Sequence, residues 1–154
     1  MDYKKLFPIF ETHKELAYLD SAATNQKPEK VIKAIDEYNR KFNASPNRGS
    51  YGISVEATCQ YNQAKGKVAK FIGAKNTEII FVKSSTEGLN LLANSFSYEL
   101  TKEDNILVGI TSHHSNIVPW QEVKRRTGAE LRYIYLDKNG EFDYDDLESK
   151  LDSN

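Results

Sequence analysis

Two short segments of this chain carry side chains that could do chemistry. The first, residues 81–90 (FVKSSTEGLN), runs from an apolar stretch through small hydroxyl residues into a helical pattern. Free N–H groups and the positive end of the dipole at a helix start bind phosphate, and the hydroxyls of Ser85 and Thr86 would add donors. The same residues also fit a capping box, in which Ser84 or Ser85 caps the helix and Glu87 reaches back. Taken alone, the segment leaves both interpretations open.

The second segment, residues 111–120 (TSHHSNIVPW), follows a predicted strand. Ligands of open α/β sheets bind at the carboxyl ends of such strands. His113 could act there as an acid or base, or lay its ring on a flat cofactor. Adjacent His113 and His114 point in different directions and only His13 remains as a third, so we predict no metal site. The alternative is that the pair are polar loop residues.

Cys59 is the single cysteine of the chain. It sits inside a helical pattern with no histidine nearby in sequence to raise its thiolate fraction, so a structural role is predicted. A lone cysteine forms no internal disulfide, which agrees with a reducing compartment.

The first half of the chain must be built mainly from helices. A strand-like run over 16–20 leads into a loop, and apolar residues at three- and four-residue steps then predict a helix over 28–43. After a polar loop over 44–54, a second amphipathic helix is predicted to end near Gly73. Its expected inward positions are Ala57, Tyr61, Ala64, Val68 and Phe71.

From Thr77 onward, strands and helices alternate. Strands are predicted at 79–82, 106–110 and 131–136. Helices are predicted from Ser84 or Ser85 to about Phe96, over 116–126 with Pro119 in the first turn, and over 143–151. This order is typical of a parallel sheet with flanking helices, so we expect an α/β fold divided into residues 1–76 and 77–154.

Composition excludes some classes of partner. The chain has 154 residues, 39% of them hydrophobic and 28% charged, and its formal net charge is -1. That balance gives no bulk field to attract nucleic acid or an anionic membrane. No apolar run approaches the roughly 20 residues that span a bilayer, so a cytoplasmic protein is expected.

Four segments together resemble one family. Residues 19–23 (LDSAA), 83–90 (KSSTEGLN), 113–120 (HHSNIVPW) and 140–147 (GEFDYDDL) are similar, in this order, to motifs of the class V aminotransferase and cysteine desulfurase family, which includes selenocysteine lyases. The resemblance implies the N-terminal portion of the type I fold of pyridoxal-phosphate (PLP) transferases, the aspartate aminotransferase-like fold, in incomplete form. It also implies a homodimer.

The resemblance further implies roles for particular residues. Ser85 and Thr86 would hold the phosphate of PLP, and His113 would stack on its pyridine ring. Ala22 and Ala23 would lie near an amino-acid substrate. Arg48 would also contact it, since Arg48 and the following glycine match part of the desulfurase pattern His-Arg-Gly-x-His.

The sequence departs from the family at three places. Ser84 replaces a glycine and Ser112 a glutamate, while Asn47 and Tyr51 stand at the two histidine positions beside Arg48. These departures leave the substrate open, so a lyase or another class V activity fits as well as a desulfurase.

The family's Schiff-base lysine and nucleophilic cysteine would lie beyond residue 154, so no catalytic residue is expected in this chain. The first hypothesis is thus an N-terminal fragment, inactive alone, of an enzyme that moves sulfur from L-cysteine to a persulfide in iron–sulfur cluster assembly, giving L-alanine and using an acceptor protein. In the second, a non-catalytic truncated chain associates with a full-length homologue through the helix over 29–43 and the loop around Arg48. The third is an unrelated α/β phosphate-binding domain.

Overall fold

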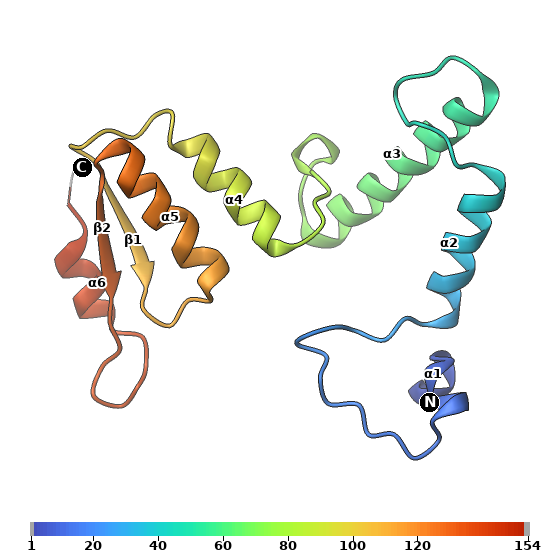
Figure 1. Cartoon of the computed structure of the whole chain (residues 1–154), viewed down its shortest axis with the longest axis horizontal. Coiled ribbons are helices and arrows are strands. Elements are labelled where there is room, and N and C mark those ends of the chain that lie inside the picture. The colour runs from blue at the N-terminus through green and yellow to red at the C-terminus, as the bar shows by residue number, and fades with distance from the viewer. Residues whose placement is uncertain (1, 153–154) are drawn as a thin grey trace. The chain divides into compact units, whose positions relative to one another are not determined.

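The computed structural model describes residues 2–152, which form two compact units divided between Ile80 and Phe81. Each unit has its own helices (Figure 1). The first unit contains the elements that follow, in chain order: a 3-10 turn η1 (Tyr3–Leu6), α1 (Ile9–Thr12), α2 (Glu29–Lys41), α3 (Gly52–Ile72) and a second 3-10 turn η2 (Asn76–Glu78).

Both long helices of the first unit were predicted from sequence. α2 follows Pro28, whose extended backbone leads into the helix, and α3 ends at Gly73, which takes the left-handed conformation that favours glycine (φ 73°). The inward face of α3 was only partly predicted. Ala57 is fully buried, whereas Phe71 is 89% exposed.

The strand-like run over 16–20 does not form a strand. A strand needs a neighbouring backbone to complete its hydrogen bonds. Here Leu19 is 92% exposed, and the segment continues directly into the loop around Ala22. Its apolar and aromatic residues indicated strand character without indicating a partner strand.

The second unit contains a small parallel sheet with three helices. Its elements, in chain order, are α4 (Ser85–Phe96), β1 (Asn105–Gly109), α5 (His114–Thr127), β2 (Glu130–Ile134) and α6 (Tyr144–Lys150). The strands pair in parallel from Asn105 with Glu130 to Gly109 with Ile134. α5 and α6 lie on opposite sides of the strands in Figure 1. The core of this unit consists of Ala93, Val108, Val123, Ala129, Leu131 and Ile134.

Two details of the chain from Thr77 onward differ from the sequence prediction. The expected strand over 79–82 is absent from the described sheet, and Ile80 is 72% exposed. Its β-branched residues favour extended backbone, but a ladder needs a partner, and β1 pairs with β2 instead. α5 also begins at His114, so Pro119 lies inside the helix and not in its first turn.

Candidate functional site

The start of α4 is capped by Ser84, in a variant of the capping box. Ser84 has extended backbone, and its hydroxyl oxygen accepts a hydrogen bond from the N–H of Glu87 (3.3 Å). The carboxylate of Glu87 in turn accepts the N–H of Lys83. The predicted cap is confirmed at Ser84, while Glu87 reaches back to the N–H of Lys83 and not to that of the cap residue.

The capping box leaves a set of donors open. Within residues 2–152, neither the N–H groups nor the hydroxyls of Ser85 and Thr86 have a hydrogen-bond partner. Both side chains are exposed at the first turn of a 12-residue helix. Ser84 accepts the N–H of Glu87, and Glu87 accepts the N–H of Lys83. Ser85 and Thr86 lie between these two capping residues and keep their donors open, so capping and an anion site are compatible here.

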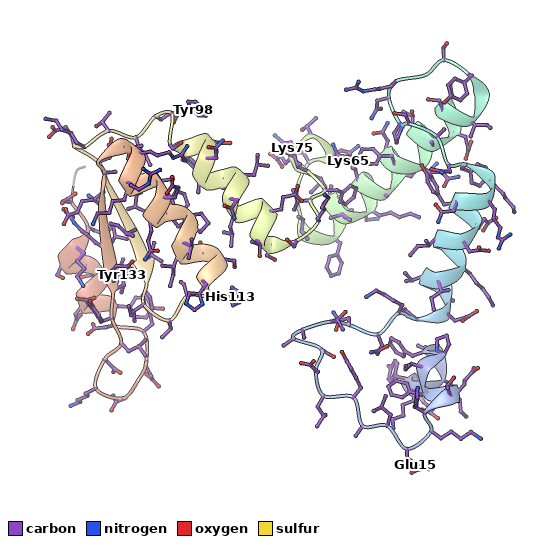
Figure 2. All side chains as sticks on the ribbon, viewed as in Figure 1. Glu15, Lys65, Lys75, Tyr98, His113 and Tyr133 are labelled. Atoms are coloured by element: carbon purple, nitrogen blue, oxygen red, sulfur yellow. The ribbon has the colours of Figure 1, made fainter. Side chains whose placement is uncertain are left out.

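His113 caps α5 with its own side chain. Its Nδ1 accepts a hydrogen bond from the N–H of Ser115 (3.1 Å) and lies 2.9 Å from the Ser115 hydroxyl oxygen. Its ring meets that of His114 edge to face, with centroids 6.3 Å apart and planes at 74°. The exposed imidazole lies at the turn between β1 and α5 (Figure 2).

α4 and α5 begin at the same end of the second unit. Near their far ends, Nη1 of Arg126 donates to Oδ1 of Asn94 (3.1 Å). Asn90 and Pro119 come before Asn94 and Arg126 in their helices and line the same hollow of about 340 Å³ between the two helices. Each lies five residues after the first residue of its helix. The helices therefore run in the same direction, side by side in Figure 1. The donors of Ser85 and Thr86 and the ring of His113 accordingly lie toward one end of the pair.

Ala22 and Ala23 lie in an exposed turn of the first unit. The carbonyl of Asp20 accepts the N–H of Ala23 (3.2 Å). The hydroxyl of Tyr18 closes the turn from the side, because it donates to the carbonyl of Thr24 at 2.6 Å. The loop thus presents two methyl groups on a fixed backbone.

Arg48 lies in another loop of the first unit, held by the start of α3. The buried hydroxyl of Ser54 donates to the carbonyl of Ser45 (2.7 Å), and the hydroxyl oxygen of Thr58 accepts the N–H of Asn47 (2.8 Å). Asn47 has φ of 62°, a left-handed conformation that asparagine tolerates. The side chain of Arg48 is exposed at the tip of this loop.

Gly49 is needed for the tight approach of this loop to α3. A Cβ at Gly49 would lie 2.6 Å from Oγ of Ser54 and 2.6 Å from a ring carbon of Tyr51. Arg48 and Gly49 therefore form one structural unit in which the glycine allows the loop to place the arginine.

Four positioning residues were not predicted from the sequence. Tyr18, Ser54 and Thr58 hold the two loops of the first unit, and Ser115 holds His113. The i, i+4 spacing of Ser54 and Thr58 on one helix face was the signal available for that pair. No sequence pattern around Tyr18 predicts its hydrogen bond to the carbonyl of Thr24.

Three other features of the described residues concern a metal site, a membrane-spanning helix and the surroundings of the cysteine. Residues 2–152 contain no cluster of three histidine, cysteine, aspartate or glutamate side chains able to hold a metal ion. No helix among them combines the length and apolar character required to cross a bilayer. Cys59 is exposed and lies 3.3 Å from the amide nitrogen of Gln63.

Comparison with known proteins agrees with the resemblance seen in the motifs. The sequence profile of the aminotransferase class-V family matches residues 17–154. A protein of Halalkalibacterium halodurans named "Probable cysteine desulfurase" is 42% identical over 97% of this chain, and the alignment covers 38% of that protein. A cysteine desulfurase of Vibrio cholerae that carries the same name is 48% identical over 82% of this chain and 32% of its own length.

Solved structures show the same relationship. The apo cysteine desulfurase of Thermococcus onnurineus superposes with a TM-score of 0.88 at 37% identity, over 97% of this chain and 36% of that protein. A cysteine desulfurase of Escherichia coli gives a TM-score of 0.81 at 30% identity over 97% of this chain and 38% of its own. The α/β fold expected from the resemblance is thus confirmed, and the chain spans between 32% and 38% of the length of these relatives. The chain belongs to the aminotransferase class-V family.

Proposed function

We propose that this chain supplies the phosphate-binding part of the PLP site of a cysteine desulfurase. The observation that carries the proposal is the donor set at the start of α4, where the N–H and hydroxyl groups of Ser85 and Thr86 are left open by the capping box. A phosphate dianion suits four such donors at the positive end of a helix dipole. The names of the aligned relatives support the choice of cofactor and enzyme class.

His113 would face the pyridine ring. It lies in the turn between β1 and α5, at the same end of the second unit as Ser85 and Thr86, and its imidazole is exposed and fixed by Ser115. An aromatic ring stacked on the cofactor keeps it flat and positioned. When bound, PLP supplies an electron sink for the α-carbon of an amino acid, and the chain's contribution is to orient the group that does so.

Ala22, Ala23 and Arg48 would contact the amino-acid substrate. Ala22 and Ala23 offer small side chains that leave room for a substrate, and the guanidinium of Arg48 suits a substrate carboxylate. Arg48 lies at the tip of a loop held by Ser54 and Thr58, so its backbone is placed before any ligand arrives.

In the whole enzyme the proposed reaction takes L-cysteine to L-alanine and leaves the sulfur on an enzyme thiolate as a persulfide. No residue of this chain is assigned to the bond-breaking steps: the proposed Schiff-base lysine and nucleophilic cysteine belong to other parts of the enzyme. A cytoplasmic homodimer that passes sulfur to an acceptor protein for iron–sulfur cluster assembly completes the proposal.

A chimera tests this function. In it, the present chain replaces the matching 36% of the Thermococcus onnurineus cysteine desulfurase. The chimera should retain PLP through gel filtration and form alanine from L-cysteine. A folded, PLP-loaded chimera that forms no alanine would contradict the desulfurase assignment.

The same chimera tests the phosphate site. Ser85→Ala combined with Thr86→Ala should release PLP, because each hydrogen bond to a charged group contributes roughly 1.5–3 kcal/mol. Ser95→Ala is the matched control, since it removes a hydroxyl from the same helix that bonds only to the carbonyl of Leu91. Equal retention of PLP by the double variant and the control would refute the site.

A second candidate function is association with a full-length homologue. One observation favours it: α2 and α3 form a mainly apolar groove of about 510 Å³ whose lining includes Val31, Ile35 and Tyr38. Val31 and Ile35 are 41% and 56% exposed. Exposed apolar surface of this kind tends to associate, which agrees with the predicted role of this helix in a dimer.

A further inference from the structure

The cap of α5 fixes the protonation pattern of the His113 ring. A backbone N–H can only donate, so the hydrogen bond from the N–H of Ser115 requires a lone pair on Nδ1 of His113 (3.1 Å). The hydroxyl oxygen of Ser115 lies 2.9 Å from the same nitrogen and can donate to it as well. In the neutral ring the single proton must then sit on Nε2.

We propose that Ser115 is a positioning residue that holds His113 as its Nε2–H tautomer. The proposal deepens the proposed function, on which it rests for the ligand that the ring meets. Two donors from one residue converge on Nδ1, whereas Nε2 has no partner among residues 2–152 and the ring is exposed. The neighbouring ring of His114 lies edge to face at 6.3 Å and makes no hydrogen bond to it.

This arrangement sets what His113 can do to a ligand. Its Nδ1 is occupied by its own helix, so the neutral ring presents an N–H donor and no free lone pair. His113 therefore meets its ligand as a hydrogen-bond donor through Nε2, toward an acceptor such as an anionic oxygen. It does not act from this state as a base. The backbone N–H and the hydroxyl of residue 115 together favour the donor role of this imidazole over the role of a base.

Nitrogen NMR of the histidine rings tests the assignment in the cofactor-free chain. The chain has three histidines, so His13→Gln and His114→Gln identify the signals of His113. At a pH well above the ordinary histidine pKa of about 6.5, Nδ1 of His113 should resonate as an unprotonated nitrogen and Nε2 as a protonated one. Ser115→Ala removes the hydroxyl and keeps the backbone N–H donor, so it should move both signals part of the way toward each other, and Ser115→Thr should restore the original separation.

Each outcome bears on the proposal. A protonated Nδ1, or tautomer averaging in the unsubstituted chain, would overturn it, and so would ring signals that Ser115→Ala leaves in place. Circular dichroism and unchanged amide signals of β1 and β2 would establish that the second unit of Ser115→Ala is folded. Because PLP is not present, a correct tautomer combined with failure of the chimera would refute only the proposed function, while the reverse result would refute only the role of Ser115.

Discussion

At the residue scale, His113 has two separable roles, one in the helix and one toward a ligand. Its Nδ1 caps α5, and its Nε2 edge and ring faces remain exposed. The sequence predicted the exposed ring at the carboxyl end of a strand, because the motif TSHHSN follows an apolar run. It did not predict the cap, since histidine is not among the residues preferred at that position.

Substitution of His113 separates these roles. His113→Ala should lower the free energy of unfolding of the second unit by about 1 kcal/mol, because the N–H of Ser115 loses its acceptor. His113→Asn should restore that stability, since an amide oxygen caps well, without restoring an aromatic ring for the cofactor. Urea denaturation followed by circular dichroism measures both. Equal stability of all three proteins would show that the cap contributes nothing.

At the element scale, α4 depends on a residue that departs from the family pattern. Ser84 stands where the family has glycine, and its hydroxyl caps the helix. The residues of this segment predicted either a capping box or a phosphate site, because both need small hydroxyl residues at a helix start. In the structure, Ser84 and Glu87 bind the backbone N–H groups near the helix start, while the donors of Ser85 and Thr86 have no partner among residues 2–152.

Ser84→Ala should destabilise the second unit by about 1 kcal/mol, whereas Ser84→Gly, the family's own residue, should cost only a few tenths of a kcal/mol. In both variants the N–H of Glu87 loses its acceptor. Glycine leaves this N–H open to water, whereas the methyl group of alanine shields it without accepting a hydrogen bond. Thermal unfolding of the two variants measures the difference. Identical melting temperatures for Ser84→Ala and the unsubstituted chain would contradict the cap.

The contact between α6 and β2 makes stability depend on pH. The ammonium of Lys150 bonds to the carboxylate of Asp146 (2.7 Å), which also accepts the N–H of Tyr135 (2.8 Å). Both contacts, that of Lys150 first, hold the pKa of Asp146 below its ordinary value. A carboxyl with a lowered pKa stabilises the fold above its unfolded pKa of about 3.9 and loses that contribution as pH falls through the folded pKa.

Asp146→Asn should therefore be less stable than the unsubstituted chain at neutral pH, and the difference should shrink as pH falls below about 4. Asp145→Asn removes an exposed carboxylate from the same turn and serves as the control. Urea unfolding at a series of pH values gives the two curves. A stability difference for Asp146→Asn that stays constant down to acid pH would exclude this ion pair as its cause.

At the scale of the whole molecule, the elements could be predicted from sequence better than their partners. Helical periodicity located α2 and α3, and alternation located β1 and β2, because these patterns are local. The runs at 16–20 and 79–82 were wrongly predicted as strands. Pairing depends on a second segment, which local composition does not report.

The inward face of α3 shows the same limit. Ala57 was correctly assigned to the core, but Val68 and Phe71 are exposed although they follow the helical period. Helical periodicity predicts which side chains share the apolar face of α3, but burial depends on which other elements pack against that face. The same reasoning applies to the groove between α2 and α3, whose apolar lining is open over about 510 Å³.

Ile35→Glu tests whether this groove associates. Ile35 lines the groove and is 56% exposed, so a carboxylate there should weaken self-association or binding to a full-length homologue by roughly tenfold or more, the equivalent of about 1.4 kcal/mol. Val55→Glu is the matched control, because Val55 is 55% exposed on α3 outside the groove lining. Sedimentation equilibrium measures both. An unsubstituted chain that stays monomeric, alone and with the homologue, would dismiss association.

The most direct test of the account follows the amide and ring signals of the isotope-labelled chain during titration with pyridoxamine 5′-phosphate, which lacks the aldehyde that would react with surface lysines. The largest shifts should occur at the N–H groups of Ser85 and Thr86 and at the ring of His113, and the Ser85→Ala, Thr86→Ala double variant should lose them. Shifts confined to other residues, or unchanged by that double substitution, would contradict a phosphate site at the start of α4.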